Sequence, residues 1–183
     1  MSVRRARVIA GIGVLVAATA VGSAAVASGS NNNDGGSGSL QVRLSGLQED
    51  PLALSTTGQG SFRVQISERR QEISYRLSYG NLEAAVTQAH IHLGGAAQSG
   101  GISVFLCSNL GNGPVGTQAC PAAPTTVSGV LRPADVVGPT GQGIAPGEFT
   151  ELITAIRAGT TYVNVHSTKY PAGEIRAQLD HGH

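Results

Sequence analysis

The sequence contains a series of short segments in which apolar and polar residues alternate. Alternation is clearest in residues 61–67 (SFRVQIS) and 72–79 (EISYRLSY), where every second residue is apolar. A period of two is typical of a β-strand with one buried face. Six further short segments are bounded by Gly, Pro, Asn or Ser: VRLSGL, AHIHL, ISVFLC, VSGVL, TYVNVHS and EIRAQL. The series predicts an all-β fold, an antiparallel β-sandwich or barrel that is immunoglobulin-like or superoxide-dismutase-like.

One segment has helical spacing instead. In residues 146–159 (PGEFTELITAIRAG), four large apolar residues recur at intervals of three and four, and Gly159 stands where a C-terminal cap belongs. We expect one short helix near residues 148–158, leading into a strand that begins at Thr161.

The N-terminal residues have the pattern of an export signal. Residues 1–27 hold three arginines, then the apolar run VIAGIGVLVAATAV, then small residues that end in AVA. This order predicts a signal peptide that is cleaved after Ala27, and hence a secreted or extracytoplasmic protein. The alternative is an uncleaved membrane anchor, because the apolar run is nearly long enough to span a bilayer.

The rest of the chain divides by composition. Residues 28–39 (SGSNNNDGGSGS) contain no apolar side chain, which predicts a flexible linker. Residues 40–180 are long enough to form one domain with a sizeable core, and residues 181–183 follow as a short tail.

Charge gives little information about partners. Residues 1–27 hold three of the twelve basic residues and none of the eleven acidic ones, so the exported chain has nine positive and eleven negative residues. The positive residues are scattered along the sequence, unlike a nucleic-acid-binding footprint. We therefore expect an extracellular protein or surface ligand as partner, no nucleic acid, and no membrane once the signal is cleaved.

The two cysteines predict a disulfide. Cys107 and Cys120 frame an irregular stretch rich in Gly, Pro and Asn. In an exported chain with an even number of cysteines, a disulfide is the expected state. The alternative is that the cysteines bind a metal or act as nucleophiles. The sequence has no CxxC motif, and no acid–base partner lies near either cysteine in the sequence.

Three histidines are the main candidates for a functional site. His90 and His92 are two positions apart in an apparent strand, so both project from one face, and His166 occupies a comparable position in YVNVH. If the two strands share a face, the three imidazoles could bind Zn²⁺ or Cu²⁺ and leave an open coordination position. The alternative is a hydrogen-bonded polar network that fixes strand register.

Charged residues are expected beside these histidines. A short connection joins the strand of His166 to GEIRAQL, which predicts a hairpin that brings Glu174 and Arg176 onto the histidine face. Glu49 or Glu174 could orient one imidazole ring as a hydrogen-bond acceptor. With Arg176, these carboxylates could form a structural polar network.

Several motifs together resemble a known family. They are LSGLQEDP, TGQGSF, EISYRLSYGNL, QAHIHLG and TYVNVHSTKYPAGEIRAQL, spread from about Leu44 to Leu179. This set resembles the CHRD domain, a module named after chordin that also occurs as single copies in bacterial secreted proteins. The sequence departs from the family pattern at QED and at Ala177, where a hydrophobic residue and a glycine are usual. The resemblance implies an exported β-sandwich or barrel with no established enzymatic activity.

Catalytic motifs give little support for an enzyme. No GxSxG or phosphate-binding loop is present, and a dinuclear copper–zinc site needs more histidines than the three in the predicted domain. The sequence favours a non-enzymatic extracellular binding or matrix module, with copper or zinc as candidate cofactor. The alternative is a mononuclear copper or zinc enzyme.

Overall fold

The structure is a computed structural model that describes residues 38–180. The expected signal peptide, most of the expected linker and the C-terminal tail lie outside the described residues. The elements, in chain order, are β1 (Gly38–Ser45), β2 (Gln59–Ser67), β3 (Glu72–Gly80), β4 (Val86–Leu93), β5 (Ile102–Ser108), β6 (Thr125–Leu131), α1 (Phe149–Arg157), β7 (Thr161–Ser167) and β8 (Ile175–Gln178). Short 3₁₀ turns occur at Gly46–Gln48, Pro133–Asp135 and Thr140–Gln142. The first strand begins at Gly38, two residues before the expected start of the domain.

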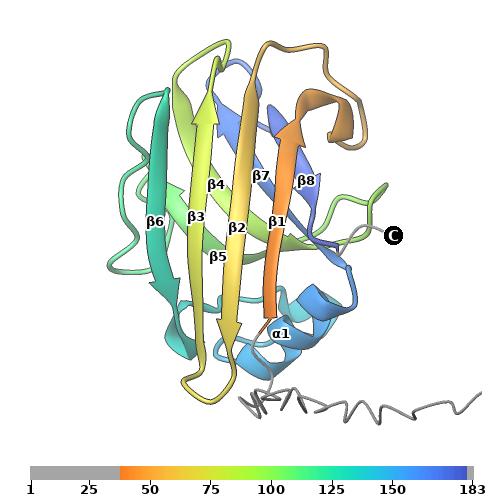
Figure 1. Cartoon of the computed structure of the whole chain (residues 1–183), viewed down its shortest axis with the longest axis vertical. Helices are drawn as coiled ribbons and strands as arrows, with labels where there is room; N and C mark the ends of the chain where they lie inside the picture. Colours follow the sequence, from red (N-terminus) through yellow and green to blue (C-terminus); the bar gives the residue numbers. More distant parts are fainter. Residues whose placement is uncertain (1–37, 181–183) are drawn as a thin grey trace, which may run out of the picture. The chain divides into compact units, whose positions relative to one another are not determined.

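The eight strands form one antiparallel sheet with the order β5-β4-β7-β8-β1-β2-β3-β6. The sheet curls into a nearly closed barrel, in which β6, β3, β2 and β1 form the near wall of Figure 1 and β5, β4, β7 and β8 the far wall. The predicted all-β antiparallel fold is therefore confirmed.

The apolar side chains that alternate with polar ones along the strands fill the interior of the barrel. In β2 and β3, the apolar residues Phe62, Val64, Ile73 and Leu77 are buried, whereas the intervening positions are polar and more exposed. The far wall contributes Ile91, among others, to the same core. One face of every strand therefore packs into a shared apolar core, as a period of two requires.

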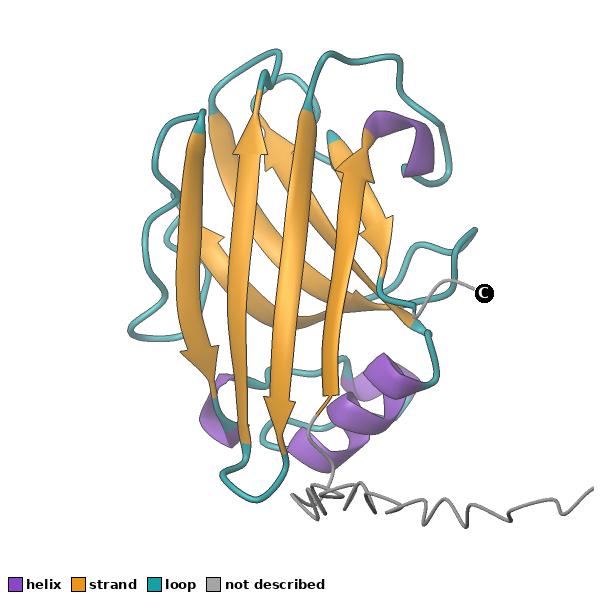
Figure 2. Cartoon of the chain, viewed as in Figure 1, coloured by secondary structure: helices purple, strands orange, loops and turns teal. Residues whose placement is uncertain are grey.

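The predicted helix is confirmed at Phe149–Arg157 and lies at one end of the barrel (Figure 2). Its buried residues are Phe149, Leu152, Ile153 and Ile156, which is the apolar stripe read from the sequence. Gly159 adopts a φ of +66° directly after the helix, so the chain turns into β7 at Thr161.

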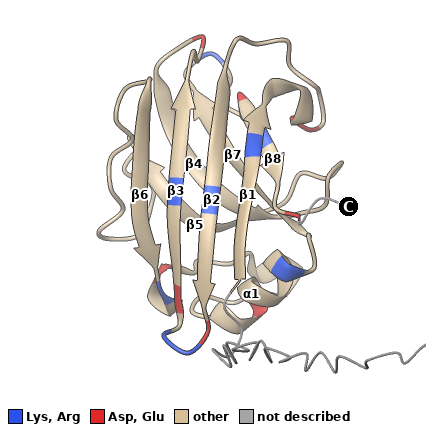
Figure 3. Ribbon diagram, in the orientation of Figure 1, with Lys and Arg blue, Asp and Glu red and all other residues tan. Residues whose placement is uncertain are grey.

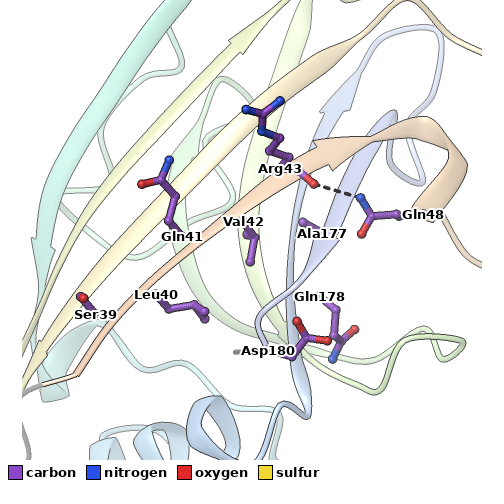
Figure 4. A pocket seen from close by; sticks show the side chains of 9 residues that line it. All are labelled: Ser39, Leu40, Gln41, Val42, Arg43, Gln48, Ala177, Gln178 and Asp180. Atoms are coloured by element: carbon purple, nitrogen blue, oxygen red, sulfur yellow. Dashed lines mark hydrogen bonds between the residues drawn. The ribbon is translucent and has the colours of Figure 1, made fainter. Parts of the chain in front are cut away.

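The barrel has a seam between β1 and β8. These strands pair at one position, Ser45 with Arg176, whereas β1 pairs with β2 along its whole length. A hollow of about 460 Å³ opens where β1 and β8 diverge, and Figure 4 shows the side chains that line it.

No helix within residues 38–180 has the length and apolar character needed to cross a membrane.

Candidate metal centre

The three candidate histidines come together on the outer face of the far wall. β4 pairs with β7 so that Gln88 faces His166 and His90 faces Asn164. Ala89, Ile91 and Val165 project into the core, so the histidines project from the opposite face. The predicted juxtaposition of His90, His92 and His166 is therefore confirmed.

The imidazole nitrogens are close enough to share one metal ion. One ligand nitrogen from each of His90, His92 and His166 lies within 4.8 Å of the others. His90 Nδ1 lies 3.2 Å from His166 Nε2. Two nitrogens bound to a tetrahedral Zn²⁺ at 2.0–2.1 Å lie about 3.3 Å apart, so this pair already has the spacing of two ligands.

Backbone carbonyls fix the tautomers of two rings. His92 Nδ1 donates to the carbonyl of Gly100 over 2.9 Å, and His166 Nδ1 donates to the carbonyl of Pro171 over 3.0 Å. Because a carbonyl oxygen only accepts, each Nδ1 carries the proton and each Nε2 presents a lone pair. This is the usual arrangement around a metal-binding histidine, whose second nitrogen donates to a carboxylate or a backbone carbonyl.

Two of the ring nitrogens are buried without a hydrogen-bond partner among the described residues. They are the Nε2 atoms of His90 and His92. Buried polar atoms are nearly always paired, because an unpaired one loses its hydration without compensation. The two nitrogens of the His90 ring point apart, so a cation on His90 Nδ1 and His166 Nε2 cannot reach His90 Nε2. His92 Nε2, with the Asn164 side chain nearby, is the unpaired nitrogen at which such a cation would restore the lost interaction.

The three imidazoles are neutral at physiological pH. Burial lowers the pKa of His90 to about 2, helped by the nearby rings of His166 and His92. Burial also lowers the pKa of His166 to about 4, although its bond to Pro171 acts in the opposite direction. The pKa of His92 is lowered mainly by burial as well. Neutral imidazole is the form that binds metals.

Three loops cover the histidine face, so that His90, His92 and His166 are 0%, 8% and 5% exposed. Residues 94–101 supply the Gly100 carbonyl, and residues 168–173 supply that of Pro171. Gly100 has no room for a side chain, because a Cβ there would lie 1.6 Å from the carbonyl oxygen of Leu93. The third loop, between β1 and β2, contributes Glu49.

Arg176 holds the covering loop 94–101 in place. It is 1% exposed and donates from Nη2 to the carbonyls of Gly95 and Gln98. Its guanidinium carbon lies 3.5 Å from the centre of the Tyr162 ring, and the His92 ring stacks on the same Tyr162 at 4.8 Å. Arg176 is therefore next to the histidine cluster, as expected, but its partners are backbone carbonyls and an aromatic ring.

Neither expected carboxylate hydrogen-bonds an imidazole in the described residues, so neither orients a ring. Glu174 accepts hydrogen bonds from the Thr56 hydroxyl and the Glu83 amide, at the end of the barrel. Glu49 packs against Gly173, where a Cβ would come within 2.7 Å of either carboxylate oxygen. Burial raises the pKa of Glu49 to about 7, although attraction to Arg176 opposes the shift. No ion pair joins either carboxylate to Arg176 in the described residues, so the expected Glu–Arg network does not form directly.

Two groups that orient the site were missed by sequence reasoning. They are the Gly100 and Pro171 carbonyls, and every residue carries a carbonyl, so the sequence holds no signal for them. Phe105, whose ring contacts His90 edge-on at 4.5 Å, was also missed. Its place in the strand next to that of His90 becomes visible only once β4 and β5 are paired.

The predicted disulfide is confirmed between Cys107 and Cys120. It ties the end of β5, the outermost strand of the far wall, to the loop that leads into β6. Both cysteines are buried and therefore contribute to the apolar core.

Comparison with known proteins agrees with the motifs. No curated protein and no solved structure matched the chain. The CHRD domain family matches residues 40–179, which include all eight strands except the first two residues of β1. The chain belongs to the CHRD domain family.

Proposed function

We propose that this CHRD domain is an exported, non-enzymatic binding module that holds one copper or zinc ion at His90, His92 and His166. The observation that carries the proposal is the set of three neutral imidazoles whose nitrogens converge within 4.8 Å. Of the nitrogens that can converge on one ion, His92 Nε2 is buried and makes no hydrogen bond within the normal distance limit among the described residues. Imidazole suits both copper and zinc.

Export is supported by two features. Residues 1–27 have the order of a signal peptide, and the Cys107–Cys120 disulfide is typical of proteins that fold in an oxidising compartment. An extracellular protein or surface ligand remains the expected partner of the module.

Burial favours a binding role over catalysis. A mononuclear copper or zinc enzyme needs space beside the metal for its substrate, and catalytic zinc keeps one position open to water. The three rings are at most 8% exposed beneath three loops. A metal here would be enclosed, which suits a stable structural or storage site better than turnover.

Metal content tests the proposal. The full chain carrying His181→Ser and His183→Ser removes the two other histidines, so that they cannot bind metal adventitiously. We expect about one copper or zinc ion per chain after dialysis, and less than about a tenth of that amount when His92→Gln and His166→Gln are added. Equal metal content in both proteins, or none in either with folding intact, would refute the metal centre.

A further inference from the structure

Three arginines that are far apart in the sequence gather on the outer face of the near wall. Arg43 in β1, Arg63 in β2 and Arg76 in β3 are all exposed. Figure 3 shows one positive position on each of these strands, level on β2 and β3 and somewhat higher on β1. The scattered sequence positions concealed this arrangement, because only strand pairing brings the three together.

The pairing register of β1, β2, β3 and β6 shows which residues lie beside the three arginines on this surface. One cross-strand row consists of Gln41, Arg63, Arg76 and Ser128, and the next consists of Arg43, Ser61, Ser78 and Thr126. The rows are two residues apart, which is roughly 7 Å along a strand. We call these eight residues the arginine face.

The arginine face is positive and lacks compensating acids. β1, β2, β3 and β6 together contain one carboxylate, Glu72. That carboxylate lies near Arg70 and Arg132 at the end of β3. Within residues 38–180, the guanidinium groups of Arg43, Arg63 and Arg76 have no hydrogen bond or ion pair.

The pairing of Arg63 with Arg76 is unfavourable for the fold. The two residues stand directly opposite each other on neighbouring strands, where like charges are destabilising. The other described arginines with charged contacts have Glu72 or Glu68 as partners. Stability therefore does not account for the Arg63–Arg76 pair, whereas an anionic ligand spanning both side chains would.

The arginines have uncharged polar neighbours. Amide and hydroxyl side chains fill the remaining positions of the arginine face, and Ser78 Oγ lies 2.8 Å from Thr126 Oγ1. An open hollow of about 820 Å³ adjoins Arg63 and Arg76 and is lined by Arg43 and polar residues of the face, together with Leu44, Tyr79 and Pro124. Figure 4 shows Gln41 and Arg43 projecting from the same side of β1, at the edge of the seam hollow.

We propose that the arginine face binds an anionic polysaccharide, with Arg43, Arg63 and Arg76 contacting its carboxylate or sulfate groups. Guanidinium groups bind such anions through paired hydrogen bonds, and the amides and hydroxyls can bond the sugar hydroxyls. The face carries no aromatic side chain on which nucleic-acid bases could stack, and no apolar side chain that could enter a membrane. This surface is independent of the histidine centre.

Binding of the full chain to polygalacturonate and to dextran sulfate tests the proposal, with neutral dextran as the uncharged control. The two anionic probes distinguish carboxylate from sulfate recognition. We expect binding to at least one of them that weakens with added salt, because exposed charges are screened. Arg63→Gln/Arg76→Gln should weaken it by at least about tenfold. The matched control is Arg69→Gln/Arg70→Gln, which removes two positive charges at the neighbouring β2–β3 turn.

Thermal unfolding of both double variants separates binding from folding. Arg63→Gln/Arg76→Gln should unfold no earlier than the unmodified chain, since it removes a like-charge pair. Absence of binding to both anionic probes, equal binding to neutral dextran, or an equal loss in the Arg69/Arg70 control would overturn the proposal. Stronger binding to single-stranded DNA or to phosphatidylserine vesicles, abolished by the same Arg63/Arg76 variant, would also overturn it in favour of another polyanion.

Discussion

His90 Nδ1 lies 3.2 Å from His166 Nε2, although 76 positions separate the two residues in the chain. Because the Pro171 carbonyl takes the proton of His166 Nδ1, His166 Nε2 is a lone-pair acceptor. Without a metal, His90 must donate to it, and the Nε2 of His90 is then left buried without a partner. A cation bound between these two nitrogens would take both lone pairs, and the His90 proton would then be on Nε2.

A first prediction concerns pH. The folded-state pKa values of His90 and His166 lie below the usual 6.5, at about 2 and about 4. The unfolded chain therefore binds more protons below pH 6.5, and the metal-free protein should lose stability as the pH falls from 6.5 to 4. Over this range each such histidine lowers the free energy of unfolding by about 1.4 kcal/mol for every pH unit. Urea unfolding at a series of pH values measures this free energy. A constant value between pH 6.5 and 4 would contradict the burial of neutral imidazoles.

Glu49 should have the opposite effect. Its folded-state pKa is raised to about 7, so protonation favours the folded state as the pH falls from 7 towards 4.5. We expect Glu49→Gln to make the acid-induced loss of stability steeper, because the opposing contribution disappears. Glu151→Gln, at an exposed position of α1, serves as the control in the same urea titration. An unchanged slope in Glu49→Gln would show that this carboxyl titrates normally.

Arg176 should matter for both stability and metal binding. Arg176→Met leaves the carbonyls of Gly95 and Gln98 without their charged donor, at a cost of about 1–3 kcal/mol. It also frees the loop whose Gly100 carbonyl orients His92, so metal affinity should fall about 10–100-fold. Denaturant unfolding and competition with a chromogenic chelator measure the two effects. Full affinity in a folded Arg176→Met protein would show that the loop does not orient the ring.

The disulfide should contribute stability without affecting the metal. Cys107→Ala/Cys120→Ala opens a loop of moderate length, which should cost up to about 3 kcal/mol. Metal stoichiometry should stay the same, since neither cysteine belongs to the three-histidine cluster. Calorimetry and metal analysis of the double variant check both statements. Loss of metal with retained folding would mean that the disulfide supports the site.

Much of the fold and part of the site could be predicted from the sequence. Strand periodicity is a local property, so it placed His90 and His92 on one face, and the short connection after His166 predicted the β7–β8 hairpin. The neighbour relation of β4 and β7 is set by packing between segments about seventy residues apart, and only the shared polarity of their outer faces hinted at it. The alignment of Arg63 with Arg76 depends on exact register, which alternation alone does not determine.

Burial of the histidine face was not predictable for a related reason. In a barrel the outer face is usually solvated, and the polar residues Asn164 and Arg176 agree with that expectation. The three covering loops bury this face through backbone carbonyls, and the sequence of a loop does not reveal where its carbonyls point. Glu174, placed by parity on the histidine face, instead accepts hydrogen bonds from Thr56 and from the Glu83 amide.

X-ray absorption at the metal edge, on the His181→Ser/His183→Ser chain loaded with one equivalent of Zn²⁺ or copper, identifies the atoms that bind the metal. We predict an inner shell that includes three imidazole nitrogens, at about 2.0–2.1 Å for zinc, and loss of this signature in His92→Gln/His166→Gln. An inner shell without histidine scattering, or an unchanged spectrum in that variant, would contradict a metal centre at His90, His92 and His166.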